Sequence, residues 1–406
     1  MPTFRAIPFR PHLRAPALLG LALLGLALLG LGAGIAAAAP GADAPPSDPA
    51  QRLAAAAQPW LPVEDPAGWS MAHASADSRA TCLRSRAVPI PAADLPRPDQ
   101  LAGLASCDAQ ALYDGNGGRP DYVRARECAY LQRPGTAQAA RSQGGFAFAG
   151  PAILMMVYAN GLGVPRNLPL ATKFACEAGG APPEIDGRLE HLRKLADAPA
   201  PGRRFDVCDD ITSGYMGGLC AARQSDRAEA ARDAVIDRIV AGYDVDQRRA
   251  FTDLRKAAGA FFDAQASNEV DLGGTARAAF EIQQEDDDWD SFVAHLRQLE
   301  ADGIPAANAA QARHADAVLN DTYRRVLANP ELRFTAPGSA FTGMGTINAN
   351  GIRQAQRRWL AYRDAWLRFA AVRRPDVERS AVLAWLSGQR SRALRAFLPR
   401  HAGGGR

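Results

Sequence analysis

Apolar residues recur every three to four positions through the second half of the chain, which is the period of an amphipathic helix. The clearest segment begins at Ile352, continues through Trp359 and Trp366, and stops before Pro375. Similar patterns predict helices over 224–242, 251–262, 289–299, 315–326 and 382–397. No stretch alternates between apolar and polar residues in the way that a half-buried strand would. The pattern therefore predicts an all-α fold.

Two acidic stretches are interpreted as helix starts. Asp226 and Glu229 have the spacing of a capping box and are expected to begin the helix over 224–242. The acidic run 285–288 stands directly before Trp289. It lacks the alternating acids and central glycine of a calcium-binding loop. We predict that it is the solvated start of the helix over 289–299, because acids near a helix N-terminus are stabilised by the helix dipole.

The N-terminal segment has a different pattern. Arg5, Arg10 and Arg14 precede an apolar run from Ala15 to Ala39 that ends in small residues. This order is typical of a secretory signal peptide, so residues 1–38 are predicted to be removed and the remainder exported to the periplasm or beyond. The run is also long enough to remain as a single anchor, because about 20 residues span a bilayer. A membrane association is expected only in that second case.

Cysteine usage agrees with an exported protein. An even number of cysteines in an oxidising compartment predicts up to three disulfides, whose connectivity the spacing leaves open. No Cys-x-x-Cys pair and no histidine at ligand spacing accompanies them, so neither a metal site nor a cofactor is expected. The disulfide candidates are Cys82, Cys107, Cys128, Cys176, Cys208 and Cys220.

Residues 39–100 are rich in proline and alanine and are predicted to form an extended lead. Between 101 and 200, an apolar helix, a glycine-rich turn and a second helix occur twice. This arrangement resembles the Sel-one-like repeats, relatives of the tetratricopeptide hairpins. The match is carried by residues 158–164 with Leu168, Ala171 and Ala175.

The Sel-one-like resemblance implies a helical solenoid that binds partners. In that arrangement Gly161 and Gly163 form a short turn with left-handed backbone angles, which strain residues that carry a side chain. Cys107 would lie on the first helix of one hairpin and Cys128 on the second, close enough to form a disulfide.

Residues 313–398 contain the string Leu-Asn-x-x-Tyr from Leu319 and the string Gln-x-x-Trp-x-x-Tyr-Arg-Asp from Gln356. These strings resemble the lysozyme-inhibitor LprI-like family. One departure is plain: the family usually has a cysteine just after the Tyr-Arg-Asp triplet, and Trp366 and Leu367 occupy that place here. The resemblance implies a small exported helical module, named for the inhibition of host lysozyme. The family-motif residues are Leu319, Asn320, Tyr323, Gln356, Trp359, Tyr362, Arg363 and Asp364.

Residues 205–302 are similar to a divergent copy of the same domain, because Cys208 and Cys220 match the paired-cysteine opening of the family. The predicted architecture is thus a helical-hairpin repeat unit at 101–200, followed by two small helical bundles at 205–302 and 308–400. We expect Arg363 to satisfy a carboxylate or a helix end within its bundle. The aromatic residues Trp359, Tyr362 and Trp366 are expected to pack against Leu319, Tyr323 and Leu394.

Motifs of catalysis are missing from the sequence. It contains no HExxH, GxSxG, P-loop or dinucleotide-binding glycine pattern. A hydrolase that uses carboxylates such as Glu269 and Asp271 is a third class of function, for which sequence spacing shows no cleft. We therefore predict that the protein is not an enzyme.

Charge is divided along the chain. The formal net charge is only +4, so a nucleic-acid partner is not expected. Residues 206–302 carry 21 acidic and 10 basic residues, whereas residues 313–406 carry 6 acidic and 17 basic residues. The two halves either neutralise each other within the fold or recruit a partner. The candidate partner-binding residues are Glu285, Asp286, Asp287, Asp288, Arg353, Arg357 and Arg358.

A cationic lysozyme would select the acidic half, whereas peptidoglycan carboxylates or anionic lipids would select the basic half. The sequence therefore predicts an exported, non-enzymatic binding protein of the bacterial envelope, and the LprI-like resemblance implies that it inhibits lysozyme-type cell-wall hydrolases. The alternative is a periplasmic scaffold that holds other proteins through its helical repeats.

Overall fold

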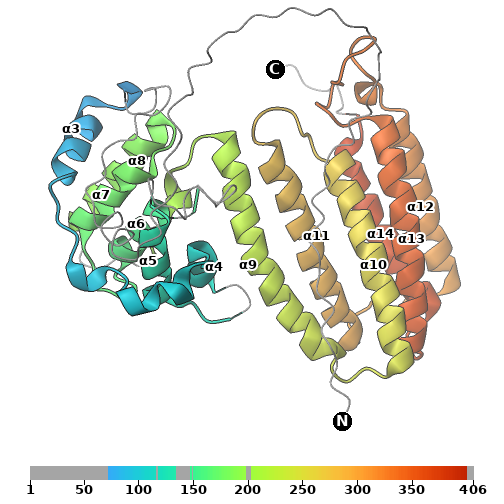
Figure 1. Ribbon diagram of the computed structural model, residues 1–406. Coiled ribbons are helices and arrows are strands. Elements are labelled where there is room, and N and C mark those ends of the chain that lie inside the picture. The colour runs from blue at the N-terminus through green and yellow to red at the C-terminus, as the bar shows by residue number, and fades with distance from the viewer. Residues whose placement is uncertain (1–71, 116–117, 134–146, 149, 198–202, 400–406) are drawn as a thin grey trace, which may run out of the picture. The chain divides into compact units, whose positions relative to one another are not determined.

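The computed structural model describes residues 72–115, 118–133, 147–148, 150–197 and 203–399, and these residues are predominantly helical (Figure 1). Within them, the only β-type pairings are isolated bridges from Thr342 to Phe334 and to Gly345. The predicted all-α fold is confirmed. The predicted signal peptide lies outside the described residues. Among the described helices, none combines the length and apolarity needed to cross a bilayer.

A first hydrophobic core is built around helix α6, whose residues from Pro151 to Ala159 are all buried. A helix that is apolar on every side needs neighbours all round. The helices of this core are α3 (Ala76–Ser85), α4 (Ala109–Asp114), α5 (Tyr122–Leu131), α6 (Pro151–Asn160), α7 (Leu168–Ala178) and α8 (Pro182–Asp197). Of these, α4, α5 and α7 pack directly on α6.

The predicted extended lead at 39–100 is wrong in its later part. Helix α3 and the short 3-10 helices Ala92–Asp94 and Pro98–Gln100 lie within it. The cause is a tertiary bond, because Cys82 of α3 is buried and joined to Cys176 of α7 by a disulfide. Composition alone does not show such a long-range attachment.

Both predicted hairpins contain a helix, a left-handed glycine and a second helix. Gly115 ends α4 with φ 71°, and Gly161 ends α6 with φ 65°. Gly163, also left-handed at φ 64°, lies so close to Val123 that a Cβ would be 3.1 Å from that residue. These positions therefore require glycine for both conformation and space.

The six cysteines form three disulfides, as the even number predicted. They join Cys82 to Cys176, Cys107 to Cys128, and Cys208 to Cys220. The pair within the first hairpin is the one that the Sel-one-like resemblance implied. Disulfides stabilise mainly by restricting the unfolded chain, and the bond across the longest segment, 94 residues, restricts it most.

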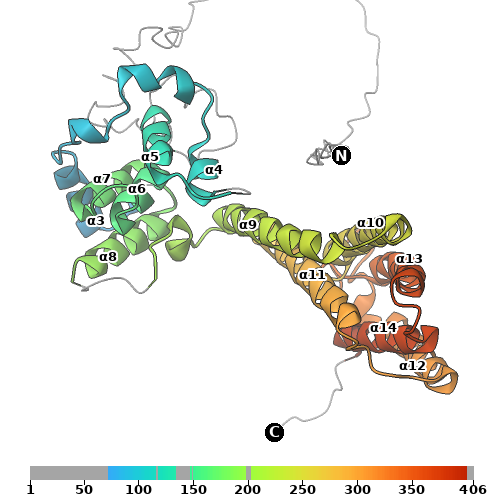
Figure 2. The same ribbon diagram turned by 90° about the horizontal axis from the view of Figure 1, so that it is seen from below.

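A second hydrophobic core extends from Ile236 to Phe397. The two predicted bundles at 205–302 and 308–400 share this core, because α10 of the first packs extensively on α13 of the second (Figure 2). Its helices are α9 (Gly214–Val240), α10 (Val245–Asn268), α11 (Arg277–Glu300), α12 (Ala309–Leu327), α13 (Ala349–Arg373) and α14 (Arg379–Leu394). The closest pairs besides α10 and α13 are α9 with α11 and α12 with α14.

The tryptophans and tyrosine of α13 lie in this core, as predicted. Tyr362 stacks on Phe261 of α10 with ring centroids 5.4 Å apart, and Trp366 meets Trp385 of α14 edge-on at 5.8 Å. Leu319, Tyr323 and Leu394 belong to or border the same core. The aromatic rings therefore come from several helices rather than from the second predicted bundle alone.

Helix α9 belongs to both cores. Its first turns contribute Met216 and Leu219 to the first core, and its later turns contribute Ile236 to the second. The predicted start near Asp226 is wrong, because the helix begins at Gly214 and Ser213 caps it. The Glu184 carboxylate of α8 accepts hydrogen bonds from the backbone N–H of Ser213 and fixes this start.

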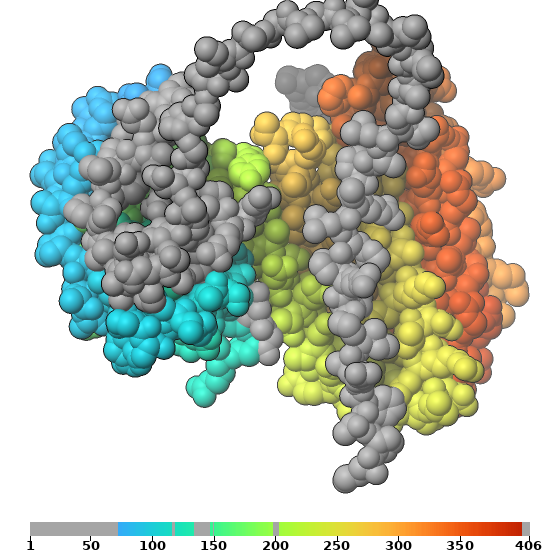
Figure 3. All heavy atoms as spheres, viewed as in Figure 1, coloured from blue at the N-terminus to red at the C-terminus, as the bar shows by residue number. Residues whose placement is uncertain are grey.

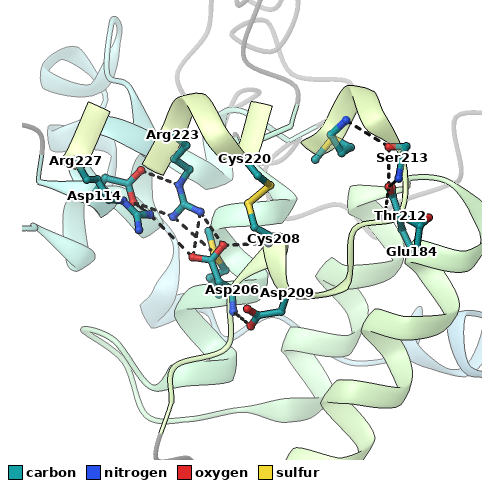
Figure 4. Close-up of a disulfide and its surroundings, with 12 residues drawn as sticks. Asp114, Glu184, Asp206, Cys208, Asp209, Thr212, Ser213, Cys220, Arg223 and Arg227 are labelled. Atoms are coloured by element: carbon teal, nitrogen blue, oxygen red, sulfur yellow. Dashed lines mark hydrogen bonds and ion pairs between the residues drawn. A yellow bond between two sulfur atoms is a disulfide. The ribbon is translucent and has the colours of Figure 1, made fainter. Parts of the chain in front are cut away.

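A buried ion network holds α9 against the first core (Figure 4). The guanidinium of Arg223, with its side chain 3% exposed, donates to both oxygens of Asp114 at 2.8 Å and to Asp206 at 2.8 and 3.0 Å. Asp206 begins the 3-10 helix Val207–Asp210, which the disulfide from Cys208 to Cys220 ties to α9. Buried charges of this kind must be paired.

Replacing Arg223 measures how much this ion network contributes to the free energy of unfolding. We expect Arg223→Leu to lower the free energy of unfolding by about 3 kcal/mol, because Asp114 keeps a buried charge that Arg227 compensates only in part. Urea titration followed by circular dichroism measures the change. The control Arg193→Leu removes an exposed ion pair and should cost less than about 1 kcal/mol. Equal losses for both variants would contradict the assignment.

Candidate functional site

The acidic run 285–288 lies in the middle of α11, so its prediction as a solvated helix start is wrong. The helix begins two turns earlier, where Ala278 packs against Gly218 of α9 with only 3.0 Å for an added Cβ. Asp286 accepts hydrogen bonds from Arg232 at 2.6 Å and from Ser225 at 2.9 Å. The Asp286 carboxylate is therefore already paired with side chains of α9, which reduces its capacity to bind a cation of a partner.

Glu285 has the most unfavourable surroundings of the predicted acidic residues. Its side chain is half-buried, and its carboxylate faces Asp263 of α10 together with Glu281 and Asp286 of its own helix. Burial, and then these three carboxylates, raise the pKa of Glu285 to about 7. Among the described residues no cation forms an ion pair with it. The face made by Asp263, Glu281 and Glu285 is called the acidic face below.

Asp288 lies one helical turn further along and points toward the core. One carboxylate oxygen accepts a hydrogen bond from Gln265 at 3.2 Å, and the other is buried without a partner in the described structure. Burial is the main reason that the pKa of Asp288 is raised to about 7, with Glu269 adding to the rise and Arg390 opposing it. Asp287, in contrast, is exposed.

The predicted basic residues Arg353, Arg357 and Arg358 are all exposed on α13. None of them forms an ion pair with an acid among residues that the structure describes, although Arg353 donates to the Asn350 side chain at 2.7 Å. Tyr323 of α12 is close enough to Arg353 and Arg357 for both to lower its pKa, against a larger rise caused by burial. A family-motif residue therefore adjoins the predicted partner-binding arginines.

The remaining family-motif residues divide between core and surface. Leu319, Trp359 and Tyr362 are buried in the second core. Exposed Asn320 donates to Asp316 at 3.0 Å. These four positions are explained by packing and local bonding.

Arg363 donates to the adjacent Asp364 at 2.8 Å and lies over the Trp359 ring at 5.6 Å. Its carboxylate partner is therefore found, as expected, within its own bundle. The last motif residue, Gln356, accepts a hydrogen bond from Arg390 at 2.9 Å.

A buried ion pair that the sequence analysis missed joins the two charged halves. Arg390 of α14 contacts both oxygens of Glu269, at 2.8 and 2.5 Å, and the two side chains are 1% and 3% exposed. The pair spans 121 residues of sequence. One signal could have revealed it, because Arg390 lies midway between the buried Leu386 and Leu394 on one stripe of α14.

The opposed charges of the two halves are thus partly neutralised inside the fold. Besides Glu269 and Arg390, Arg373 of α13 pairs with Glu300 of α11 at 2.6 Å, and Arg374 pairs with Asp302. The acidic face and the outward arginines of α13 remain outside these pairs. Some of the opposite charges therefore neutralise each other within the fold, while others remain at the surface where a partner could contact them.

The carboxylates considered for a hydrolase have other contacts. Glu269 is held by Arg390, and Asp271 accepts a hydrogen bond from the backbone N–H of Thr346 at 3.0 Å. A search of the described residues finds no cluster of three or more histidine, cysteine or acidic side chains able to hold a metal ion. Glu269 and Asp271 are therefore both engaged in contacts within the fold.

Asp288 makes stability depend on pH in a defined direction. A pKa near 7 in the folded chain, against about 4 in the unfolded chain, means that stability is greatest below pH 4 and is lost as pH rises through 7. We expect Asp288→Asn to raise the free energy of unfolding by about 2 kcal/mol at pH 8 and to change it little at pH 4. Urea titrations of variant and parent at both pH values measure the difference, with exposed Asp287→Asn as the control. A stabilisation that is the same at both pH values would contradict this role.

Comparison with known proteins yields no relative for this chain. No protein-family model, no curated protein and no solved structure matches it. What the protein binds must therefore be inferred from its own side chains, chiefly the acidic face and the arginines of α13.

Proposed function

We propose that this chain is an exported, non-enzymatic binding protein of the bacterial envelope, which uses its acidic face to bind a cationic cell-wall hydrolase of the lysozyme type. One observation carries the proposal: Glu285 is half-buried among Asp263, Glu281 and Asp286, and no ion pair to Glu285 occurs in the described part of the chain. A cation that binds to such a carboxylate stabilises it more than it would stabilise a carboxylate that already has an ion-pair partner.

The physical consequence is a coupling between binding and ionisation. An arginine or lysine of the partner placed against Glu285 would favour the charged carboxylate and lower its pKa. Since that pKa is about 7 in the free protein, affinity is expected to rise between pH 6 and pH 8. Added salt is expected to weaken binding, because the acidic face is at the surface.

Three further features support export and an inhibitory role. The three disulfides persist in oxidising compartments and are rare in the cytosol. The arginine-led apolar segment at 15–39 has the order of a signal peptide. The LprI-like resemblance of residues 313–398 points to lysozyme inhibitors, and we propose membership of that family for this segment.

A second candidate is a periplasmic scaffold. The observation that favours it is exposed apolar side chains on two helices of the first core, Leu83 of α3, which is 60% exposed, and Val123 of α5, which is 45% exposed. Capture of the same envelope protein by the parent chain, and its loss with Leu83→Ser and Val123→Ser, would support this role.

The inhibitory role is tested by the digestion of cell walls by lysozyme at low salt. The parent chain at micromolar concentration is expected to slow digestion, and the double variant Asp263→Asn with Glu281→Gln to weaken inhibition about tenfold. Inhibition by the parent should also increase from pH 6 to pH 8. Absence of inhibition at micromolar protein would refute the proposal.

A matched control separates a local face from net charge. Asp246→Asn with Asp253→Asn removes two exposed acids from the same helix, α10, without touching the surroundings of Glu285. This control is expected to leave inhibition within about twofold of the parent. Equal weakening by both double variants would assign the effect to total charge and contradict the acidic face.

A further inference from the structure

The connection from α12 to α13 contains a long segment without charge. From Phe334 to Ile352 no acidic or basic residue occurs, and arginines stand at both borders, Arg333 and Arg353. Both arginines are exposed and have no acidic partner among residues that the structure describes. Connections on protein surfaces are normally polar and often charged, so this composition is unusual for an exposed segment. Residues 333–347 are called the phenylalanine loop below.

The backbone of the phenylalanine loop is held in place by hydrogen bonds. The Thr342 hydroxyl donates to the Ile347 carbonyl at 2.7 Å, and the backbone N–H of Thr342 donates to the Gly345 carbonyl at 2.7 Å. Asp271, in the connection between α10 and α11, accepts from the backbone N–H of Thr346 at 3.0 Å. The loop is therefore anchored to the bundle and presents a defined surface.

That surface is apolar at its centre. Phe334 is 51% and Phe341 is 52% exposed. The two phenylalanines lie on paired stretches of the loop, because Phe334 bridges to Thr342 and the N–H of Thr335 donates to the Phe341 carbonyl at 3.0 Å. Single exposed apolar residues are common, but each of these two rings is half exposed on the same anchored loop, which therefore offers apolar side chains for a contact.

The phenylalanine loop lies at one end of the helical bundle (Figure 1 and Figure 3). It lies beyond the end of α12 and the start of α13 (Figure 1), and its orange atoms lie at the upper end of the bundle in the space-filling view (Figure 3). Arg357 follows Arg353 one turn later on α13 and is exposed as well. Apolar rings at the centre with cations at the border is the arrangement of a protein segment that binds an anionic membrane surface.

We propose that the phenylalanine loop binds the surface of an anionic phospholipid bilayer, with Phe334 and Phe341 at the depth of the head groups and Arg333, Arg353 and Arg357 on the phosphates. Aromatic rings favour that depth, and each arginine near an anionic surface strengthens binding about fivefold. The uncharged backbone between the arginines avoids carrying charge into the interface. This site is separate from the acidic face, so either proposal can fail without the other.

The test places a fluorescent reporter in the loop of the full chain. Phe341→Trp is mixed with vesicles of phosphatidylcholine and phosphatidylglycerol whose acyl chains carry bromine, and the emission of the parent chain is subtracted. We expect the added emission to be quenched and blue-shifted with these vesicles, and to be unchanged with phosphatidylcholine alone. Phe334→Trp serves as a second reporter if Phe341→Trp does not fold, as judged by its melting temperature.

The control reporter is Val245→Trp, at the first residue of α10, where Val245 is 78% exposed. If the chain attached to vesicles only through the apolar segment 15–39, the phenylalanine loop would not be closer to the lipid than Val245. The two reporters would then be quenched to the same extent. Quenching of the loop reporter no greater than that of Val245→Trp would overturn the proposal and leave the loop as a contact for a protein. Equal quenching with and without phosphatidylglycerol would also overturn it.

The contribution of the side chains is measured by vesicle sedimentation. Phe334→Ser with Phe341→Ser is expected to reduce partition into phosphatidylglycerol vesicles about tenfold or more, because two half-exposed rings lose their apolar contact. Arg333→Gln with Arg353→Gln is expected to reduce it by a similar factor. Arg97→Gln with Arg193→Gln, which removes two exposed arginines from the part of the chain before α9, should leave partition within about twofold. Unchanged partition of the phenylalanine variant would contradict insertion.

Discussion

The buried pair of Glu269 and Arg390 is the interaction on which the helical bundle depends. Two side chains of opposite charge, 3% and 1% exposed, meet inside an apolar core, and Gln356 accepts the remaining contact of the guanidinium. Either charge alone would be unfavourable there, because the desolvation of an ion is repaid only by a close and well-hydrogen-bonded partner. The pair therefore requires α14 and the end of α10 to lie together, and it joins an acidic half of the chain to a basic half.

This joining explains which charges remain at the surface. The acids and arginines nearest to the contact between the halves, such as Glu300 and Arg373, neutralise each other. The carboxylates of the acidic face on α10 and α11, and Arg353, Arg357 and Arg358 on α13, have no ion-pair partner among the described residues. The protein thus presents surfaces of opposite sign, and the proposals assign a cationic hydrolase to one and an anionic lipid surface to the other. Neither proposal requires a catalytic group.

Helix α9 has a comparable role between the two cores. Its first turns are fixed by Arg223, by the Cys208–Cys220 disulfide and by Glu184 of α8, whereas its later turns pack on α11. Because α9 is fixed at its first turns and packs on α11 at its later turns, it links the disulfide-bonded first core to the helical bundle. The close approach of Gly218 to Ala278 then determines where α11 begins, and so where its acidic residues lie.

The sequence by itself determined the features that depend on neighbours along the chain. The helical period, the left-handed glycines at 161 and 163, the pairing of an even set of cysteines and the burial of Trp359, Tyr362 and Trp366 all follow from local geometry and hydrophobicity. Only the tertiary structure decided which acids are paired. Asp286 meets Arg232 while Glu285, its immediate neighbour, faces three carboxylates, because successive residues of a helix point about 100° apart toward different helices. Those helices are distant in sequence, so their packing, and not the local pattern, decides which charges are left for a partner.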